Sequence, residues 1–365
     1  MLFPELPEEY LHGINQSRRC CHGSAQVSNK SFNNPLKRMN LNLNNVQDIL
    51  LISLSNLGDV ILSFPVIDIL KRDFPTARLS IVVGPKAESF FAGNPHIDQV
   101  YVFNKHSSNL QKIQWIRELR KKHFDLVIDL RNSAIPFMIR ARKRTLPNIA
   151  NSSSQHMKIK HLNHLKSIVP FETESEKRYA LFISQEDTRS IDRILKKELA
   201  QDQKIFIISP GAANHIKRWE KDGFVSVCDH LVATYRCNII FIGDHNDAQI
   251  SAQIQSAMRH PSLNLCGQTT LTQLADLLSR SVLALVNDSA VMHLASYLRV
   301  PVVAIFGPTD PKKYGPWGNS RHIVVQKDIF CSPCERASCL YQHECMKLLE
   351  PLDVIHAIEK IMKCS

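Results

Sequence analysis

Several features that would assign a chain to a common protein class are missing from this sequence. No apolar run approaches the roughly 20 residues that a membrane-spanning helix needs. The P-loop pattern G-x-x-x-x-G-K-[S/T] is absent, which argues against a P-loop ATPase or GTPase. No RNP, zinc-finger or helix-turn-helix pattern occurs, so the sequence gives no indication of a nucleic-acid partner.

Acidic residues are missing from one long stretch of the chain. Residues 140–170 contain seven Lys or Arg and three His but no Asp or Glu, in a protein whose formal net charge is +11. A basic surface suits an anionic partner such as a membrane surface or an acidic substrate. An ordinary solvated face is the alternative.

Length and composition indicate a globular protein of two domains. The chain has 365 residues, 44% of them hydrophobic and 22% charged, which are values typical of folded domains. Residues 1–38 differ, because they show neither a helical nor a strand period and no continuous apolar segment of a secretory signal. We expect a disordered extension there, and Met39 is a candidate start just before the first strand.

The ten cysteines do not form the framework of a small secreted protein, and they favour a reducing compartment. Four of them are clustered as Cys331, Cys334, Cys339 and Cys345, with His343 among them. Four thiols at this spacing fit a tetrahedral zinc site sterically. Reduced or locally disulfide-bonded cysteines are the alternative.

The first half alternates strands with helices. We expect strands at 48–54, 79–83, 100–103 and 126–129, and helices at 60–72 and 110–122, which predicts a mostly parallel sheet with helices on both faces. The first strand ends in a turn that contains Asn56 and Asp59, at the sheet edge where ligands bind. By itself, Asp59 is expected to cap the helix.

The fourth strand of that half ends in Arg131 and Asn132. Both residues therefore lie at the same carboxyl edge as Asp59. A structural salt bridge is an equally good interpretation of Arg131.

The second half repeats the alternation, and its last unit is the most informative. The strand at 282–286 is followed by Asp288 and Ser289, a helix from Ala290 to Leu298, and a second strand at 302–306. The free N–H groups and the positive dipole end of such a helix suit a phosphate. An N-capping Asp288 in an ordinary βαβ unit is the alternative.

Together the motifs of both halves resemble glycosyltransferase family 9, whose best-known members are the ADP-heptose:lipopolysaccharide heptosyltransferases. The motifs are S-x-x-G-D-V-I-x-x-x-P at 55–65, P-G-A at 210–212, K-R-W at 217–219, D-S-A-x-x-H-L-A at 288–295, P-V-V-A-I-F-G-P-T-D-P at 301–311 and Y-G-P at 314–316. The resemblance covers roughly residues 48–363.

The resemblance implies an α/β fold of GT-B architecture, with two doubly wound Rossmann-like domains facing each other across a cleft. After the extension at 1–38, we expect an acceptor-side domain at 39–180 and a nucleotide-sugar-binding domain at 181–350. The final helix, at 351–365, is expected to return to the first domain.

The resemblance also implies an inverting, metal-independent transfer of heptose, or a related sugar, from an ADP-sugar to a lipopolysaccharide core acceptor. Asp59 matches the catalytic base, and Lys217 matches the lysine that contacts the nucleotide phosphates; a surface lysine is the alternative for Lys217. Asn56, Arg131 and Asn132 are expected on the acceptor side. The nucleotide-sugar site is expected to comprise Ser209, Gly211, Lys217, Asp244, Asp247, Thr269, Asp288, Ser289, Ala290 and His293.

No cofactor is required for such a reaction, and structural zinc at the four clustered cysteines is the one metal considered. The expected partners are an ADP-sugar donor, an anionic lipopolysaccharide-core or other glycolipid acceptor, and the inner membrane surface as a peripheral contact, but no nucleic acid. The expected location is the cytoplasm, at the cytoplasmic face of the inner membrane.

Two other functions remain open. A nucleotide-sugar 2-epimerase of the same architecture would bind the nucleotide sugar without an acceptor, and Asp59 in the first loop favours transfer over epimerisation. A non-catalytic sugar-nucleotide or lipid-binding protein would not need Asp59, Lys217, Asp288 and His293 together.

Overall fold

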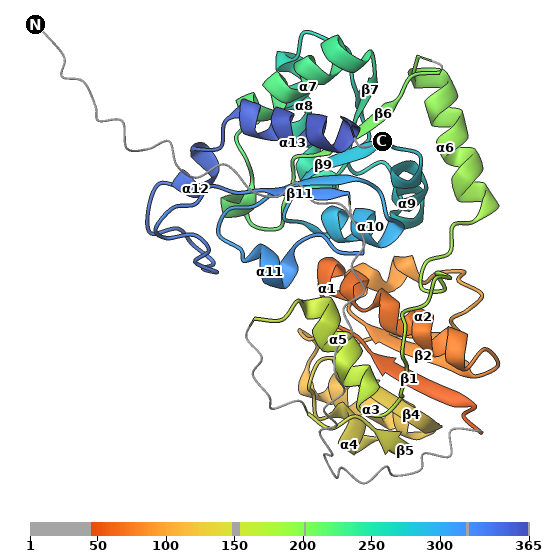
Figure 1. Ribbon diagram of the computed structural model, residues 1–365. Coiled ribbons are helices and arrows are strands. Elements are labelled where there is room, and N and C mark those ends of the chain that lie inside the picture. Colours follow the sequence, from red (N-terminus) through yellow and green to blue (C-terminus); the bar gives the residue numbers. More distant parts are fainter. Residues whose placement is uncertain (1–44, 148–153, 201, 319–320, 364–365) are drawn as a thin grey trace, which may run out of the picture. The chain divides into compact units, whose positions relative to one another are not determined.

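Two parallel β-sheets form the framework of the described residues (Figure 1). The structure is a computed structural model that describes residues 45–147, 154–200, 202–318 and 321–363. Residues 45–365 cluster as one unit. The expected extension at 1–38 and the candidate start at Met39 lie outside the described residues.

The first sheet has the strand order β3-β2-β1-β4-β5, and all its pairs are parallel. Its strands are β1 (Asp48–Ile52), β2 (Arg78–Val83), β3 (Gln99–Val102), β4 (His123–Asp129) and β5 (Arg140–Arg144). Strand β1 is buried along Ile49–Ile52, as expected for a central strand covered by helices on both faces.

The helices of this half are α1 (Leu57–Leu62), α2 (Phe64–Asp73), the 3₁₀ helix η1 (Pro85–Phe90), α3 (Asn109–Arg120), α4 (Ile135–Met138) and α5 (Met157–Lys166). One helix was expected at 60–72, but the chain forms α1 and α2, which meet at Ser63. Pro65 explains the break, because proline lacks an N–H and is tolerated only in the first turn of a helix. The Ser63 hydroxyl donates to the Val60 carbonyl at 2.7 Å and so closes the end of α1.

The second sheet has the order β11-β10-β9-β6-β7-β8, again with parallel pairs. Its strands are β6 (Ile205–Ser209), β7 (Asn238–Phe241), β8 (Leu263–Asn264), β9 (Leu283–Asn287), β10 (Val302–Ile305) and β11 (His322–Val325). The longer helices of this half are α6 (Gln185–Glu198), α7 (Lys221–Tyr235), α8 (Ala248–Ala257), α9 (Leu271–Ser279), α10 (Ala290–Leu298) and α13 (Pro351–Lys363). Its shorter helical turns are η2 (His215–Lys217), η3 (His245–Asp247), α11 (Pro311–Tyr314) and α12 (Glu344–Lys347).

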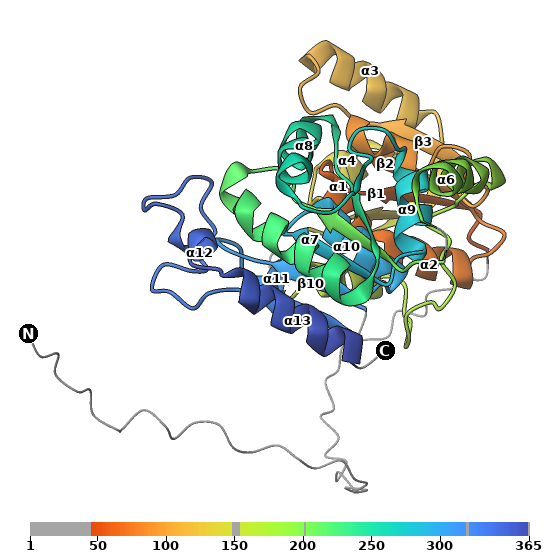
Figure 2. The same ribbon diagram turned by 90° about the horizontal axis from the view of Figure 1, so that it is seen from above.

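The last helix corrects an expectation from the sequence. Helix α13 was expected to return to the first domain, but it lies along α7 in both views (Figures 1 and 2) and also contacts β10 and β11. Its buried stripe, Val354, Ile358 and Ile361, joins the core of the second sheet. The expected return is therefore wrong for residues 351–363, because this stripe is already covered by the second half.

The basic stretch at 140–170 is more regular than its composition suggested. It contains the edge strand β5 and the helix α5, while residues 145–147 and 154–156 lie in neither a helix nor a strand. Helix α5 packs on α1 and α2, whereas α6 packs on α9. The chain therefore passes from the first sheet to the second between α5 and α6, in a stretch that contains the expected boundary at residue 180. In the part of the chain that is described, no helix is long and apolar enough to cross a membrane.

His161 connects α5 to α1 through a buried contact. Its side chain is 3% exposed, and Nδ1 lies 3.3 Å from the Leu62 carbonyl oxygen. Because that oxygen only accepts, Nδ1 carries the proton, and Nε2 is left buried without a partner. Burial lowers the pKa of His161 to about 4, so the folded protein keeps this ring neutral.

We expect His161 to weaken the fold in acid. Its pKa is about 4 when folded and about 6.5 when unfolded, so its contribution is complete above pH 6.5 and is lost as the pH falls towards 4. His161→Asn keeps a donor near the Nδ1 position but does not titrate. Between pH 7 and pH 4 the wild type should lose on the order of 3 kcal/mol more unfolding free energy than this variant, measured by urea unfolding. Parallel pH profiles would contradict this assignment.

Candidate active site

The carboxyl ends of the central strands bring together most of the residues singled out in the sequence. In sheets of this order, ligands bind where the connections leave in opposite directions, here between β1 and β4 and between β6 and β9. The residues at or just after the ends of these four strands are Asn56 and Asp59, Arg131 and Asn132, Ser209 and Gly211, and Asp288 and Ser289.

Asp59 lies in the first turn of α1 and is half-buried. Its carboxylate accepts from the Asn56 side-chain amide at 3.0 Å, and α1 has no side-chain cap. Burial raises the pKa of Asp59 and the nearby Asp288 adds to the rise, while the Asn56 bond and the Lys217 charge oppose it. Asp59 is thus a carboxylate of increased basicity, within electrostatic reach of groups on the second sheet, and does not act as a helix cap.

Lys217 and Asp288 form an ion pair in the second half. The Lys217 ammonium lies 2.7 Å from the Asp288 carboxylate, and the two side chains are 31% and 8% exposed. Asp288 does not cap α10, whose N-cap residue is Ser289. Lys217, at the end of η2, is therefore neither a free surface lysine nor fully buried.

The start of α10 presents polar groups without partners. Ser289 Oγ and His293 Nδ1 are buried and make no hydrogen bond with the described residues. Such atoms call for an explanation, because buried polar groups are normally paired. Burial lowers the pKa of His293 to about 4, although Asp288 opposes this, so the ring is neutral near pH 7 and can bind an oxygen atom of a ligand.

The two halves touch at this helix start. A Cβ atom placed on Gly58 would lie 3.1 Å from His293 Cδ2 and 3.7 Å from Ala290 Cα. Helix α1, which carries Asp59, thus packs directly against the first turn of α10. Glycine at position 58 lets the two helices approach this closely, because a side chain there would press on the His293 ring.

Asp247 and Asp244 have structural partners of their own. Asp244 is the N-cap of η3 and accepts from the Asn246 and Asp247 backbone N–H groups at 2.8 and 3.2 Å, while Asp247 accepts from the Asp244 N–H at 3.1 Å. The Asp247 carboxylate occupies the space where a side chain on Gly211 or Gly243 would stand. The Asp247 carboxylate thus packs between the loop of Gly211 and the loop of Gly243. The exposed Asp244 is the better candidate for a ribose contact.

Ser209 and Thr269 are two further polar residues predicted for the nucleotide-sugar site. Ser209 ends β6 and is 1% exposed, and Thr269 precedes α9 and is half-buried.

On the first sheet, Asp129 accepts from the Arg131 and Ser133 N–H groups at 2.9 and 2.6 Å, which shapes the turn after β4.

Arg131 does not form the salt bridge considered as its alternative role. Its guanidinium lies over the Phe103 ring at 5.0 Å, and Nη1 is buried without a partner. No carboxylate of the described residues lies within ion-pair distance of it. Asn132 has a φ of 54°, in the left-handed region that asparagine tolerates better than most residues.

Sequence reasoning missed three neighbours of the site. Tyr314, in the Y-G-P motif, is close enough to Asp59 and Asp288 for both charges to raise its pKa, after burial. The Nε2 atom of His156 lies 3.0 Å from the Gly315 carbonyl oxygen. Asn287 is fully buried, donates to the Pro210 carbonyl at 2.8 Å and accepts from the Trp219 N–H at 3.3 Å, and its place directly before Asp288 was the available signal.

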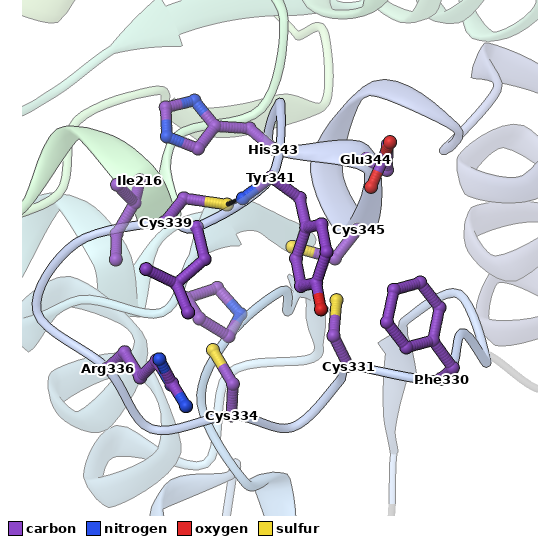
Figure 3. Close-up of a pocket in the computed structure, with 12 residues that line it drawn as sticks. Ile216, Phe330, Cys331, Cys334, Arg336, Cys339, Tyr341, His343, Glu344 and Cys345 are labelled. Carbon is purple, nitrogen blue, oxygen red and sulfur yellow. Dashed lines mark hydrogen bonds between the residues drawn. The ribbon is translucent and has the colours of Figure 1, made fainter.

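The four clustered cysteines line a cavity of about 280 Å³ elsewhere in the second half (Figure 3). All are free thiols. In the described residues, no group of three or more His, Cys, Asp or Glu side chains is arranged to hold a metal ion. Four thiols are a chemically suitable donor set for zinc, but they are not arranged around a common ion position in this structure.

Comparison with known proteins shows which family the chain belongs to. Residues 113–344 match the sequence model described as Glycosyltransferase family 9 (heptosyltransferase). The chain belongs to glycosyltransferase family 9. It is therefore a glycosyltransferase.

Relatives of this family 9 chain span nearly its whole length. It is 26% identical to a lipooligosaccharide heptosyltransferase 2 of Campylobacter jejuni over 85% of this chain and 96% of that protein. A family 9 glycosyltransferase structure from Veillonella parvula aligns with a TM-score of 0.77 at 23% identity, covering 87% of this chain and 98% of that one. The E. coli ADP-heptose lps heptosyltransferase II aligns with a TM-score of 0.71 at 18% identity, covering 87% and 99%. The chain has the GT-B fold.

Proposed function

We propose that this enzyme transfers heptose, or a related sugar, from an ADP-sugar to a lipopolysaccharide core acceptor. The observation that carries the proposal is the proximity of Asp59, a basic carboxylate on the first sheet, to the Lys217–Asp288 pair on the second. A transferase needs a base for its acceptor and a cation for its leaving group side by side. The Campylobacter relative is a lipooligosaccharide heptosyltransferase, which supports the choice of sugar and acceptor.

The reaction is a single inverting displacement. Asp59 takes the proton of the acceptor hydroxyl, and the acceptor oxygen forms a bond to the anomeric carbon of the donor sugar. The bond from that carbon to the diphosphate breaks at the same time, and its electron pair leaves with ADP. Burial supports this role, because raising the pKa of Asp59 makes it a stronger base near neutral pH.

The second half is suited to hold the donor. Lys217 would meet the negative charge that develops on the leaving diphosphate. The open N-terminus of α10 and the unpaired atoms Ser289 Oγ and His293 Nδ1 would donate to its oxygens. Ser209 at the end of β6 and Gly211 just after it would line the nucleotide, with Asp244 and Thr269 beside the ribose and the base.

The first half is suited to an anionic acceptor. Asn56 holds Asp59, and Arg131 leaves a buried guanidinium nitrogen without a partner at the neighbouring strand end. Asn132 follows it in the same turn. Neither a 2-epimerase nor a non-catalytic binding protein has an acceptor hydroxyl to deprotonate, and the family match favours transfer over both.

Replacing Asp59 with Asn tests the proposed base. Asn keeps the size and an acceptor for Asn56, but it cannot take a proton. Turnover with an ADP-heptose donor and a core acceptor should fall by about 10²–10⁴-fold. The melting temperature and the affinity for ADP should stay close to the wild-type values, because the donor contacts lie on the other sheet.

Lys217→Ala is the matched comparison, and it should weaken ADP binding and turnover together. Near-normal turnover of Asp59→Asn with the true donor and acceptor would show that the base lies elsewhere. Equal loss of ADP affinity in both variants would point to a shared structural role.

We also place the enzyme at the cytoplasmic face of the inner membrane as a peripheral protein. Its candidate contact is the α3–α4–β5 surface, which consists of the exposed side chains of Leu110, Ile113, Phe137, Met138, Arg140 and Arg142. Helix α4 touches both α3 and β5, so these side chains belong to neighbouring elements. The mixture suits an anionic bilayer, since the basic groups can meet headgroups while the apolar ones enter the interface.

Vesicle binding tests this surface. Binding to vesicles containing phosphatidylglycerol should weaken as salt rises, because surface charges are screened beyond about 8 Å at physiological ionic strength. Arg140→Gln with Arg142→Gln should weaken binding by roughly 30-fold, at about 1 kcal/mol per cation. Leu352→Ser, on α13 and 59% exposed, is a control that should not change binding. Salt-independent binding, or none, would identify the basic stretch 140–166 as an ordinary solvated face.

A structural zinc ion at Cys331, Cys334, Cys339 and Cys345 stays a prediction. Their common cavity supports it, and transfer itself is proposed to need no metal. Protein purified without chelator should then contain about one zinc per chain, and chelation should loosen the segment before α13. Metal-free protein whose four thiols all react with a thiol reagent would instead identify reduced cysteines lining a cavity.

A further inference from the structure

A buried carboxylate connects the two halves away from the proposed chemistry. Asp68 lies in α2 and is 3% exposed. Its Oδ1 accepts from the backbone N–H groups of Tyr179 and Ala180 at 2.6 and 2.9 Å, in the segment that leads from the first sheet to the second. The Tyr297 hydroxyl, on α10, donates to the same carboxylate at 2.9 Å from Oδ2.

The connecting segment is fixed from its other side as well. Asn94, 4% exposed, donates from Nδ2 to the carbonyl oxygens of Tyr179 and Ala180 at 2.9 and 3.1 Å. Asp68 thus takes the N–H groups of two successive residues while Asn94 takes their carbonyl groups. The difference between the two side chains is that Asp68 also reaches α10.

Tyr297 is well packed around this bond. Its side chain is 5% exposed, its ring meets Phe64 edge to face at 5.0 Å, and the Arg178 guanidinium lies over the ring at 5.6 Å. Phe64 begins α2, the helix that carries Asp68. Helix α2 therefore holds α10 by an aromatic contact and by a hydrogen bond.

The geometry gives this bond a role in alignment. Tyr297 follows Ala290 by seven residues on α10, which is about two turns or roughly 10 Å along the helix axis. The start of α10 faces the proposed donor and rests on Gly58, and Asp59 stands beside Gly58 on α1. The first half thus touches α10 at two points, near its start through α1 and near its end through α2.

We infer that Asp68 is a positioning residue, which sets the orientation of α10 relative to α1 through Tyr297 and thereby the distance from Asp59 to the donor. The inference rests on the proposed transfer reaction. A position chosen for stability alone would favour an apolar side chain, because burying a carboxylate is costly even when it is hydrogen-bonded. Burial indeed raises the pKa of Asp68 to about 6, although the two amides, Tyr297 and Arg178 oppose the rise.

Tyr297→Phe isolates the link to α10 in the full-length chain. It removes one hydroxyl and keeps the ring against Phe64 and both bonds from the connecting segment to Asp68. We expect kcat for sugar transfer to fall between about tenfold and 100-fold, since small misplacements of reacting groups have effects of this size. The Kd for ADP should remain at the wild-type value, because the donor site belongs to the second half.

Three variants separate positioning from stability. Asp68→Asn should retain most of kcat, because its oxygen can accept from the two amides while its NH₂ donates to Tyr297. Asn94→Ala loosens the same connecting segment without touching α10, so it should lower the melting temperature with a smaller loss of kcat than Tyr297→Phe. Tyr235→Phe, on α7, controls for the loss of a tyrosine hydroxyl and should change neither.

Either of two results would overturn the inference. One is a kcat of Tyr297→Phe near the wild-type value, and the other is an equal kcat loss in Asn94→Ala. A wild-type enzyme that binds ADP but transfers no sugar would instead count against the proposed function, which keeps the two failures distinct.

Discussion

The contact between α1 and α10 is the constraint on which the arrangement of this enzyme depends. Each helix begins at the carboxyl end of a central strand, β1 in one sheet and β9 in the other, and the two helix starts meet with only a glycine between them. Because parallel sheets deliver their loops to one edge, this contact brings Asp59 within electrostatic reach of Lys217 and Asp288. A larger side chain at Gly58 would press on His293 and push the start of α1, with Asp59, away from α10.

Much of this arrangement could be predicted from the sequence, because it depends on patterns among residues that are close together in the chain. The strand, polar turn and helix around Asp288 each have short-range signals, and α10 begins and ends where the pattern predicted, at Ala290 and Leu298. The position of Asp59 after the first strand was equally readable. Lys217 was found in another way, because the K-R-W motif at 217–219 resembles the family pattern.

Other features depend on contacts that no local pattern contains. The bond between Asp68 and Tyr297 joins residues 229 positions apart, and the docking of α13 on α7 depends on which apolar face remains uncovered after folding. The edge strand β5 was missed because its residues, RARKR, are nearly all charged, although a strand at a sheet edge needs little apolar surface. Asp247 was expected to face a ligand, but its carboxylate turns back into its own loop, where it accepts a hydrogen bond from the Asp244 N–H.

If Lys217 binds the diphosphate as proposed, its ion pair with Asp288 bears on the end of the catalytic cycle as well as on its beginning. A diphosphate that binds Lys217 must compete with a carboxylate already 2.7 Å from the ammonium, so part of the attraction to the nucleotide is offset by the partner it displaces. The same carboxylate is available to take the ammonium back once the sugar has moved. Asp288 would thus lower the affinity for the product ADP and shorten its residence time on the enzyme.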